Sequence, residues 1–327
     1  MTRQKGNNMR ILTALVLLSL PFTVGANELR TPWGAPSFNG TWTTATLTPL
    51  ERPLSVDKPA LSDSQRTQLE AEQEGRMAAI DAGPPPEGSV GGYNRAWLDP
   101  GMKMLEDGRT SLIISPSNGR IPWRPEAKAI SDAQRARYGV GPFNSHTDLD
   151  TGERCLSDGV TMAPLQPYNM NFRFVQTPDY LMIYQEMYHE YRIIPLTDKI
   201  TPTGAPMWLG EPNAYWQGDT LVVESNNFLD KSDYFWAWPW RAARPSLKIT
   251  ERFTRLDATT IDYRFIVEDP EMFTEPWTVS APLTTDQASR GVTAGLIYEF
   301  ACHEGNYALP NVLRGARLSE ADAAGGE

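Results

Sequence analysis

Hydrophobic and polar residues alternate in short runs over the second half of the chain, from about residue 171 onward. A period of two is typical of strands that bury one face. Tight-turn signals separate the runs, among them Gln217-Gly218-Asp219 and Asp269-Pro270. The pattern predicts antiparallel strands, arranged as a barrel or a sandwich, in NFRFVQT, YLMIYQEMY, YRIIPLT, AYWQGDTLVVESNNF, LKITERFTRLD, TTIDYRFIVED, WTVSAPLTT and GLIYEFACH.

The first part of the chain carries helical signals as well. A helix is predicted from Ser62 to Ala82, which starts with an N-cap residue and continues in good helix formers, and another from Pro125 to Arg137. Gly40-Thr41-Trp42 opens a first strand, and Asn118-Gly119 predicts a hairpin between two short strands.

Carboxylates interrupt the apolar face of several predicted strands. Glu186, Glu251 and Glu304 each follow apolar neighbours at alternate positions. A buried carboxylate needs a cationic partner or a raised pKa. Arg192 and Arg252 are the arginines that the neighbouring strands offer.

The N-terminus has the order of an export signal. Basic residues come first, the apolar run Ile11 to Leu20 follows, and Val24-Gly25-Ala26 ends in small residues. We expect cleavage of residues 1–26 and a periplasmic mature protein. The mature chain is predicted to be a single domain, 27–327, with the first strand, helices and hairpin in 27–150 and the main strands in 151–327.

A net charge of −10 disfavours nucleic acid and anionic membrane surfaces as partners. The expected partner is a small aromatic substrate or ligand. The sequence leaves the oligomeric state open, a homodimer included.

The only cysteines are Cys155 and Cys302. An oxidising compartment permits a disulfide between them, and such a bridge would stabilise the fold by about 4–5 kcal/mol in the chain-entropy model. Two separate buried thiols are the alternative.

His189 is the strongest catalytic candidate, because Glu186 and Arg192 each lie three residues away. A histidine oriented by a carboxylate serves as a general base, and an arginine stabilises a developing oxyanion. Tyr184 or Glu304 would then act on the leaving oxygen. The alternative is a surface turn with a local ion pair.

Adjacent strand residues point to opposite faces, so His303 and Glu304 are not expected to enter one cavity together. Glu304 shares a face with Tyr298 and is the better cavity residue, with Tyr298 as a substrate contact. A core salt bridge is the alternative role for Glu304. Glu251 and Glu304 would also be the pair to compare with a glycan-cleaving site.

Trp236, Trp238 and Trp240 alternate in an aromatic segment that would lay three rings across a barrel mouth. A hydrophobic cluster that anchors a loop is the alternative. Trp208, Tyr188 and Tyr191 add further rings. Lys248 would hold a phenolate, and Glu251 a polar substrate group, if their side chains face inward.

No nucleotide-binding loop, serine-hydrolase elbow or C-x-x-C motif appears in the sequence. His146 lies near Asp148 and Asp150, but such acidic stretches are mostly solvated loops. We therefore expect neither a cofactor nor a bound metal.

Phrases along nearly the whole mature chain resemble a family of exported bacterial proteins common in sphingomonad-type and soil bacteria. The resemblance implies no settled reaction. This sequence departs from the family at Lys248, where a histidine is frequent, so no role is carried over there. The phrases are PLERP (49–53), NGRIP (118–122), ERC (153–155), QTPDYLMIYQEMYHEYRIIPL (176–196), WQGDTLVVESNNF (216–228), ERFTR (251–255) and ACHEGNY (301–307).

A weaker resemblance, carried by the G-x-W at 40–42 and the strand WQGDTLVV, is to lipocalin-like barrels. It implies an antiparallel lipocalin-like β-barrel with helical N-terminal decoration and an interior cavity.

The family resemblance also implies hosts that degrade plant-derived aromatic compounds. The leading hypothesis is a cofactor-independent periplasmic lyase that acts by acid–base catalysis on a lignin-type aromatic dimer and releases an aldehyde such as formaldehyde. The alternative is a non-catalytic lipocalin-like binding protein for hydrophobic or aromatic small molecules. The polarity of the cavity separates the two, because an enzyme needs several titratable groups that converge on one point.

Overall fold

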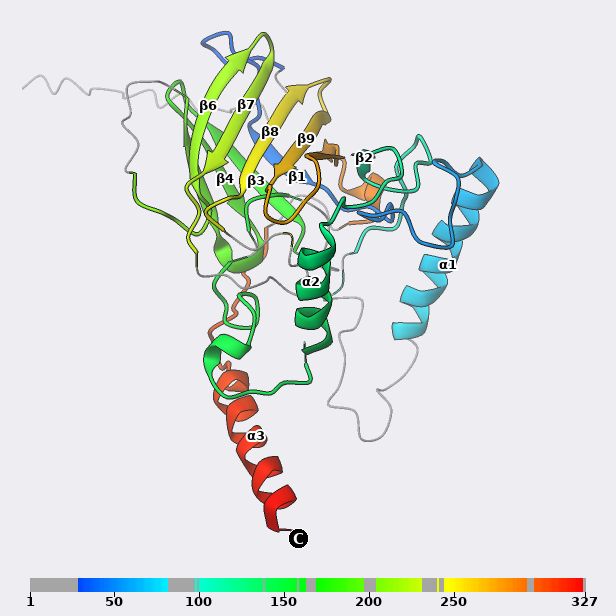
Figure 1. The fold of residues 1–327 in the computed structure, drawn as a ribbon. Helices are drawn as coiled ribbons and strands as arrows, with labels where there is room; N and C mark the ends of the chain where they lie inside the picture. The colour runs from blue at the N-terminus through cyan, green and yellow to red at the C-terminus, as the bar shows by residue number, and fades with distance from the viewer. Residues whose placement is uncertain are drawn as a thin grey trace, which may run out of the picture.

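A computed structural model describes most of the chain after residue 28, and its dominant feature is one antiparallel sheet (Figure 1). The predicted signal peptide, 1–26, lies outside the described residues. The mainly antiparallel β fold predicted from the sequence is confirmed. The structure describes residues 29–81, 98, 100–137, 139–157, 159–162, 169–196, 204–230, 240, 244–292 and 297–325.

The strands follow the alternating runs of the sequence closely. They are β1 (Gly40–Thr43), β2 (Ile113–Ser115), β3 (Asn171–Gln176), β4 (Tyr180–Gln185), β5 (Tyr191–Pro195), β6 (Glu211–Gln217), β7 (Thr220–Asn226), β8 (Lys248–Arg255), β9 (Thr260–Glu268), β10 (Trp277–Ser280) and β11 (Leu283–Thr284). The helices are α1 (Asp63–Asp81), α2 (Pro125–Arg137) and α3 (Ala308–Gly325).

The sheet is strongly curved, so that β6 to β9 stand in front of β4, β3 and β1 (Figure 1). Its strand order is β5-β4-β3-β1-β11-β9-β8-β7-β6. The end strands β5 and β6 come close to each other, but no ladder joins them in the described part of the chain. The sheet therefore approaches a barrel and leaves an opening between β5 and β6.

Aromatic side chains fill the space between the two halves of the sheet. The ring of Phe253 on β8 lies 6.0 Å from Phe174 on β3 and 6.1 Å from Phe38. Such ring pairs contribute about 0.5–1.5 kcal/mol each beyond their buried area. The described residues at the centre of this sheet form a packed core. They do not form the open interior cavity that the lipocalin-like resemblance predicted.

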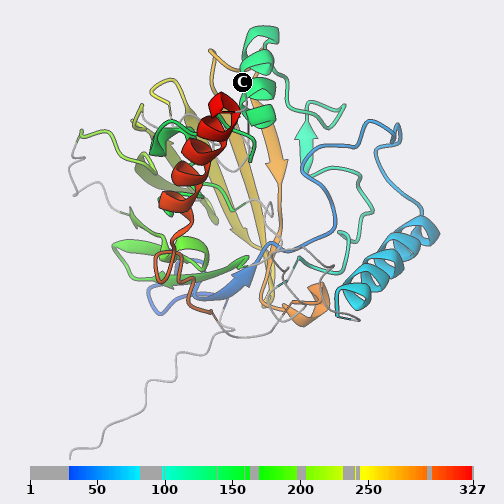
Figure 2. The ribbon, with the colours of Figure 1, turned by 90° about the horizontal axis from the view of Figure 1, so that it is seen from below.

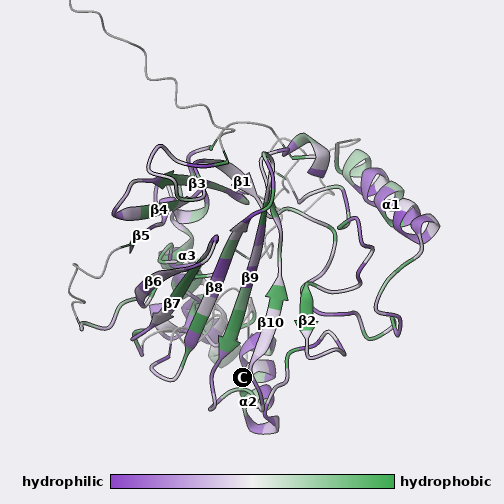
Figure 3. Cartoon of the chain, turned by 90° about the horizontal axis from the view of Figure 1, so that it is seen from above, coloured by the Kyte–Doolittle hydropathy of each residue, from purple (hydrophilic) through white to green (hydrophobic). Residues whose placement is uncertain are grey.

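Both predicted helices form, and each covers a different side of the molecule. Ser62 caps α1, since its hydroxyl accepts from the Gln65 N–H and its own N–H donates to the Gln65 side chain. Figure 3 shows hydrophobic residues concentrated on the strands and polar ones along much of α1. No helix among the described residues is long and apolar enough to span a membrane.

Two sequence predictions fail at the edges of the sheet. The predicted hairpin around Asn118-Gly119 does not form, because Ile113–Ser115 pairs with β10 instead. The predicted strand ending at His303 is absent over residues 297–303, which run as an irregular segment. The helix that follows, α3, was not predicted. It extends away from the sheet in Figure 1 and therefore overlaps the strands only in the view from below (Figure 2).

Candidate functional site

A pocket of about 630 Å³ opens beside β5, which is an end strand of the sheet. This volume is in the range of small-molecule sites. One wall comes from residues 188–193, and the other wall comes from residues 206–210 and Pro212. Leu156 and Leu229 complete the lining.

The turn between β4 and β5 has an unusual backbone. Tyr188 and His189 have φ values of 58° and 51°, in the left-handed region that side-chain-bearing residues rarely adopt. Strained residues of this kind cluster at functional sites. Both residues line the pocket, and the His189 imidazole makes no hydrogen bond to the described part of the chain.

The free edge of β5 faces the pocket. The Gln185 N–H donates to the Glu190 carbonyl at 2.7 Å, which fixes residues 190, 192 and 194 as the positions that bond to β4. The N–H and C=O groups of Tyr191 and Ile193 therefore point away from β4. Both residues line the pocket, so its wall offers main-chain donors and acceptors.

The opposite wall is apolar, and consists of Met207, Trp208 and Leu209. Main-chain bonds hold it in place, because the Met207 N–H donates to the Asn227 carbonyl at 3.1 Å and its carbonyl accepts from Leu229 at 2.9 Å. Gly210 follows with a φ of 66°, and a Cβ there would lie 2.6 Å from the Asn226 carbonyl oxygen. Only glycine fits that close approach.

A buried ion pair lies beneath the pocket. Arg192 is one of the lining residues, and its Nη2 binds the Glu251 carboxylate at 2.6 Å. The Tyr263 hydroxyl donates to the same carboxylate at 2.9 Å. The prediction that Glu251 is buried and paired with an arginine is confirmed, with Arg192 as the partner, whereas Arg252 donates to Gln217 at the surface.

The charge of Glu251 affects the pKa of Arg192 and of Tyr263. Burial lowers the pKa of Arg192, but the charge and hydrogen bond of Glu251 outweigh burial and leave that pKa raised. Burial raises the pKa of the Tyr263 hydroxyl well above its usual value, and the negative charge of Glu251 adds to the effect. Arg192 also donates to the Val160 carbonyl at 3.1 Å, so its guanidinium is largely engaged within the protein rather than free to hold an oxyanion.

Glu186 is buried but does not meet His189. Its carboxylate accepts from the N–H groups of Tyr298 at 2.7 Å and Asn171 at 3.2 Å. Burial raises the pKa of Glu186, and these backbone hydrogen bonds offset the effect only in part. The predicted pairing of Glu186 with His189 is therefore wrong, because the carboxylate is turned toward β3 and the C-terminal segment.

Two other predicted catalytic groups lie outside the pocket. Tyr184 sits on the outer face of β4, opposite Arg173 and Tyr191 on the neighbouring strands. Glu304 is exposed on the irregular segment before α3, so the expectation that it faces a cavity is wrong, and it does not oppose the buried Glu251. His303 is exposed beside it.

The predicted substrate contacts are also scattered. Trp240 is 1% exposed and packs edge-on against Trp277 in the core, with ring centroids 5.1 Å apart, so it does not line the pocket beside β5. Trp236 and Trp238 lie outside the described residues. Lys248 faces outward toward Glu224 and Glu268, and Tyr298 has an exposed ring while its main chain binds Glu186.

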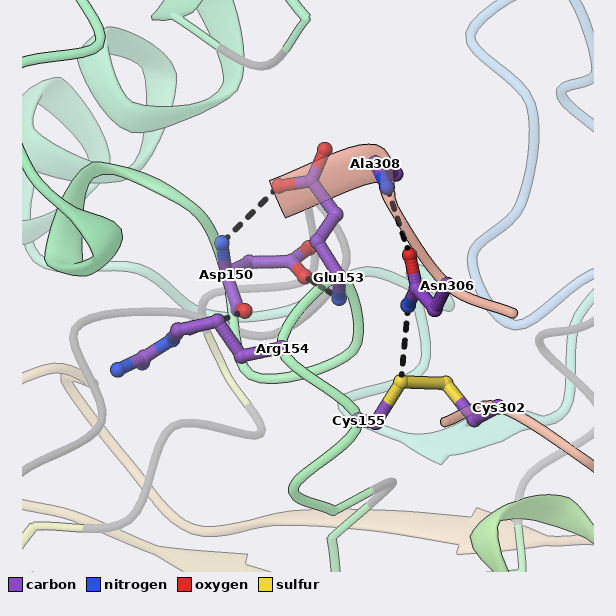
Figure 4. Close-up of a disulfide and its surroundings, with 7 residues drawn as sticks. All are labelled: Asp150, Glu153, Arg154, Cys155, Cys302, Asn306 and Ala308. Atoms are coloured by element: carbon purple, nitrogen blue, oxygen red, sulfur yellow. Dashed lines mark hydrogen bonds between the residues drawn. A yellow bond between two sulfur atoms is a disulfide. The ribbon is translucent and has the colours of Figure 1, made fainter. Parts of the chain in front are cut away.

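Cys155 and Cys302 form a disulfide, as predicted (Figure 4). A disulfide indicates an oxidising location outside the cytoplasm. Within the described residues no group of three or more His, Cys, Asp or Glu side chains is placed to hold a metal ion, and His146 is exposed.

Of the groups named from the sequence, the structure brings His189, Arg192, Tyr188, Tyr191 and Trp208 to one pocket. The sequence analysis missed Met207 and the free edge of β5, because no local pattern shows which strand will lie at the edge of a sheet. No protein-family model, curated protein or solved structure matches the chain.

Proposed function

We propose that this protein binds a small aromatic molecule in the pocket beside β5. The observation that carries the proposal is the pocket itself, a hollow of about 630 Å³ with an apolar wall on one side and a free strand edge on the other. Ligand sites combine apolar lining with a few placed polar groups in this way.

The lining supports a ligand with a planar apolar body and a polar rim. Trp208, Tyr188 and Tyr191 offer ring surfaces. The main chain of Tyr191 and Ile193 and the imidazole of His189 offer hydrogen bonds at the rim. The resemblance to proteins of aromatic-degrading bacteria agrees with an aromatic ligand, and periplasmic binding after signal cleavage is part of the proposal.

A lyase is the second candidate, and one observation favours it. The His189 imidazole has no partner in the described part of the chain and sits on a strained backbone at the pocket. It has the freedom to take a proton from a bound aromatic dimer in a step that releases formaldehyde. The carboxylate that would orient it is missing, because Glu186 is engaged elsewhere, so binding without chemistry is favoured.

Mass spectrometry separates the two candidates. The purified mature protein is incubated with a panel of lignin-type aromatic dimers, and the masses of both bound and released compounds are determined. Binding with unchanged masses is the expected result. A loss of formaldehyde mass that disappears in His189→Ala would establish the lyase instead, and failure of every dimer to bind would count against both.

A further inference from the structure

The segment 297–306, here called the C-terminal strap, lies against the pocket wall at three points. The Tyr298 N–H donates to Glu186 Oε1 at 2.7 Å. The Phe300 ring meets the Tyr188 ring edge-on at 4.8 Å. Cys302 is joined to Cys155.

Each of these anchors adjoins a residue that shapes the pocket. Glu186 begins the turn that carries His189, and Tyr188 lines the pocket itself. Leu156, which follows Cys155 directly, is also part of the lining. The strap therefore supports the side of the pocket formed by the β4–β5 turn.

The strap is mostly exposed. None of its side chains is fully buried, and it forms no strand ladder in the described structure. The disulfide joins it to a residue 147 positions earlier in the chain. Without that covalent link, non-covalent contacts such as the Tyr298 hydrogen bond and the Phe300 ring contact would have to hold a mostly exposed segment in place.

Both ends of the disulfide are prepared by local hydrogen bonds (Figure 4). Asp150 and Glu153 bond each other's main-chain N–H groups at 3.0 and 2.7 Å, which shapes the turn before Cys155. Asn306 Nδ2 lies 3.5 Å from the Cys155 sulfur, and its Oδ1 accepts from the Ala308 N–H at the start of α3. The start of α3 is thus tied to the same point.

We propose that the C-terminal strap positions the pocket wall and that the disulfide makes ligand binding depend on redox state. A dithiol reductant would transfer two electrons and two protons to the bridge, which yields the Cys155 and Cys302 thiols while the dithiol becomes a disulfide. The released strap would no longer support Tyr188 and His189, and ligand affinity would fall. The inference rests on the proposed function of this pocket.

The test uses N-phenyl-1-naphthylamine, an aromatic probe with a naphthalene and a phenyl group, whose fluorescence rises on binding. Its Kd is measured for the mature protein before and after reduction by dithiothreitol, and for the double variant Cys155→Ser/Cys302→Ser. We expect the Kd to rise at least about tenfold in the reduced protein and in the variant, with no further effect of dithiothreitol on the variant. Near-ultraviolet circular dichroism checks that the sheet stays folded.

Phe300→Ala in the disulfide-bonded protein provides a second readout, with Phe300→Tyr as its matched control. The alanine should raise the Kd and the tyrosine should leave it near the wild-type value. If reduction unfolds the chain, the comparison of the two Phe300 variants alone tests the inference. An unchanged Kd in the reduced protein or in Phe300→Ala overturns the inference and leaves the proposed function standing, whereas absence of probe binding to the oxidised wild type contradicts the proposed function itself.

Discussion

At the scale of single residues, the pair Arg192–Glu251 combines two roles. It ties β5 to β8 through the interior of the sheet, and its arginine reaches the pocket. Taking both charges out of water is costly, and the cost is offset only while both partners are present and hydrogen-bonded. The pair therefore matters most when one member is removed.

Arg192→Ala should lower the free energy of unfolding by about 3–5 kcal/mol, because it leaves the fully buried Glu251 without a cation. Chemical denaturation measures the change. Lys248→Ala is the matched control, since its exposed contacts with Glu224 and Glu268 lie on the outer face of the same sheet and are worth less than about 1 kcal/mol. Equal effects of the two variants would argue against a buried pair.

Glu186 predicts a pH dependence with a definite sign. Its folded-state pKa is raised above 4.5 by burial, so its protonated form fits the fold better than the carboxylate. The stability that this raised pKa adds to the folded state is fully present below pH 4.5 and is lost as the pH rises through the folded-state pKa. Wild type should therefore lose stability relative to Glu186→Gln between about pH 4.5 and neutrality. Denaturation of both proteins across this range checks it, and a difference that does not change with pH contradicts it.

At the scale of elements, the alternating pattern predicted strands well. Most runs from residue 171 to residue 284 became strands because alternation reports burial of one face. The pattern failed at GLIYEFACH, where apolar residues pack on a turn and a disulfide rather than in a ladder. The pattern also wrongly predicted a hairpin at Asn118-Gly119. The strand before this turn pairs with the distant β10, and such long-range pairing leaves no local signal in the sequence.

Amide hydrogen exchange tests the free edge of β5. The amides of Tyr191 and Ile193 should exchange much faster than those of Arg192 and Ile194, because only the latter two point toward β4. The four alternate along one strand, so each serves as a control for its neighbour. Uniform protection along β5 would mean that a ladder with β6 closes the sheet, and the pocket wall would then lack its main-chain groups.

At the scale of the whole molecule, phrases that are far apart in the sequence meet at one place. ERC at 153–155, the turn after β4 and ACHEGNY at 301–307 are joined by the disulfide and by the contacts of the C-terminal strap. ERFTR at 251–255 supplies the partner of Arg192. The sequence identified most of these groups, but not their arrangement, because the pocket depends on where the sheet path ends.

The same arrangement explains why the predicted catalytic residues do not form one site. Spacing of three residues placed Glu186 and Arg192 near His189 in sequence, but a left-handed turn and a change of strand direct the three side chains differently. Glu186 binds backbone N–H groups, Arg192 binds Glu251, and His189 is left at the pocket. Proximity in sequence therefore identified the region and misjudged the chemistry.

The most direct test of the central claim is a titration of N-phenyl-1-naphthylamine against two matched variants. Met207→Glu places a charge on the apolar pocket wall, at a side chain that is 38% exposed. Ile130→Glu makes the same kind of change on α2, at a side chain that is 57% exposed and does not line the pocket. We predict saturable binding to wild type and Ile130→Glu and at least about tenfold weaker binding to Met207→Glu. Equal affinity of all three proteins would contradict a ligand site beside β5.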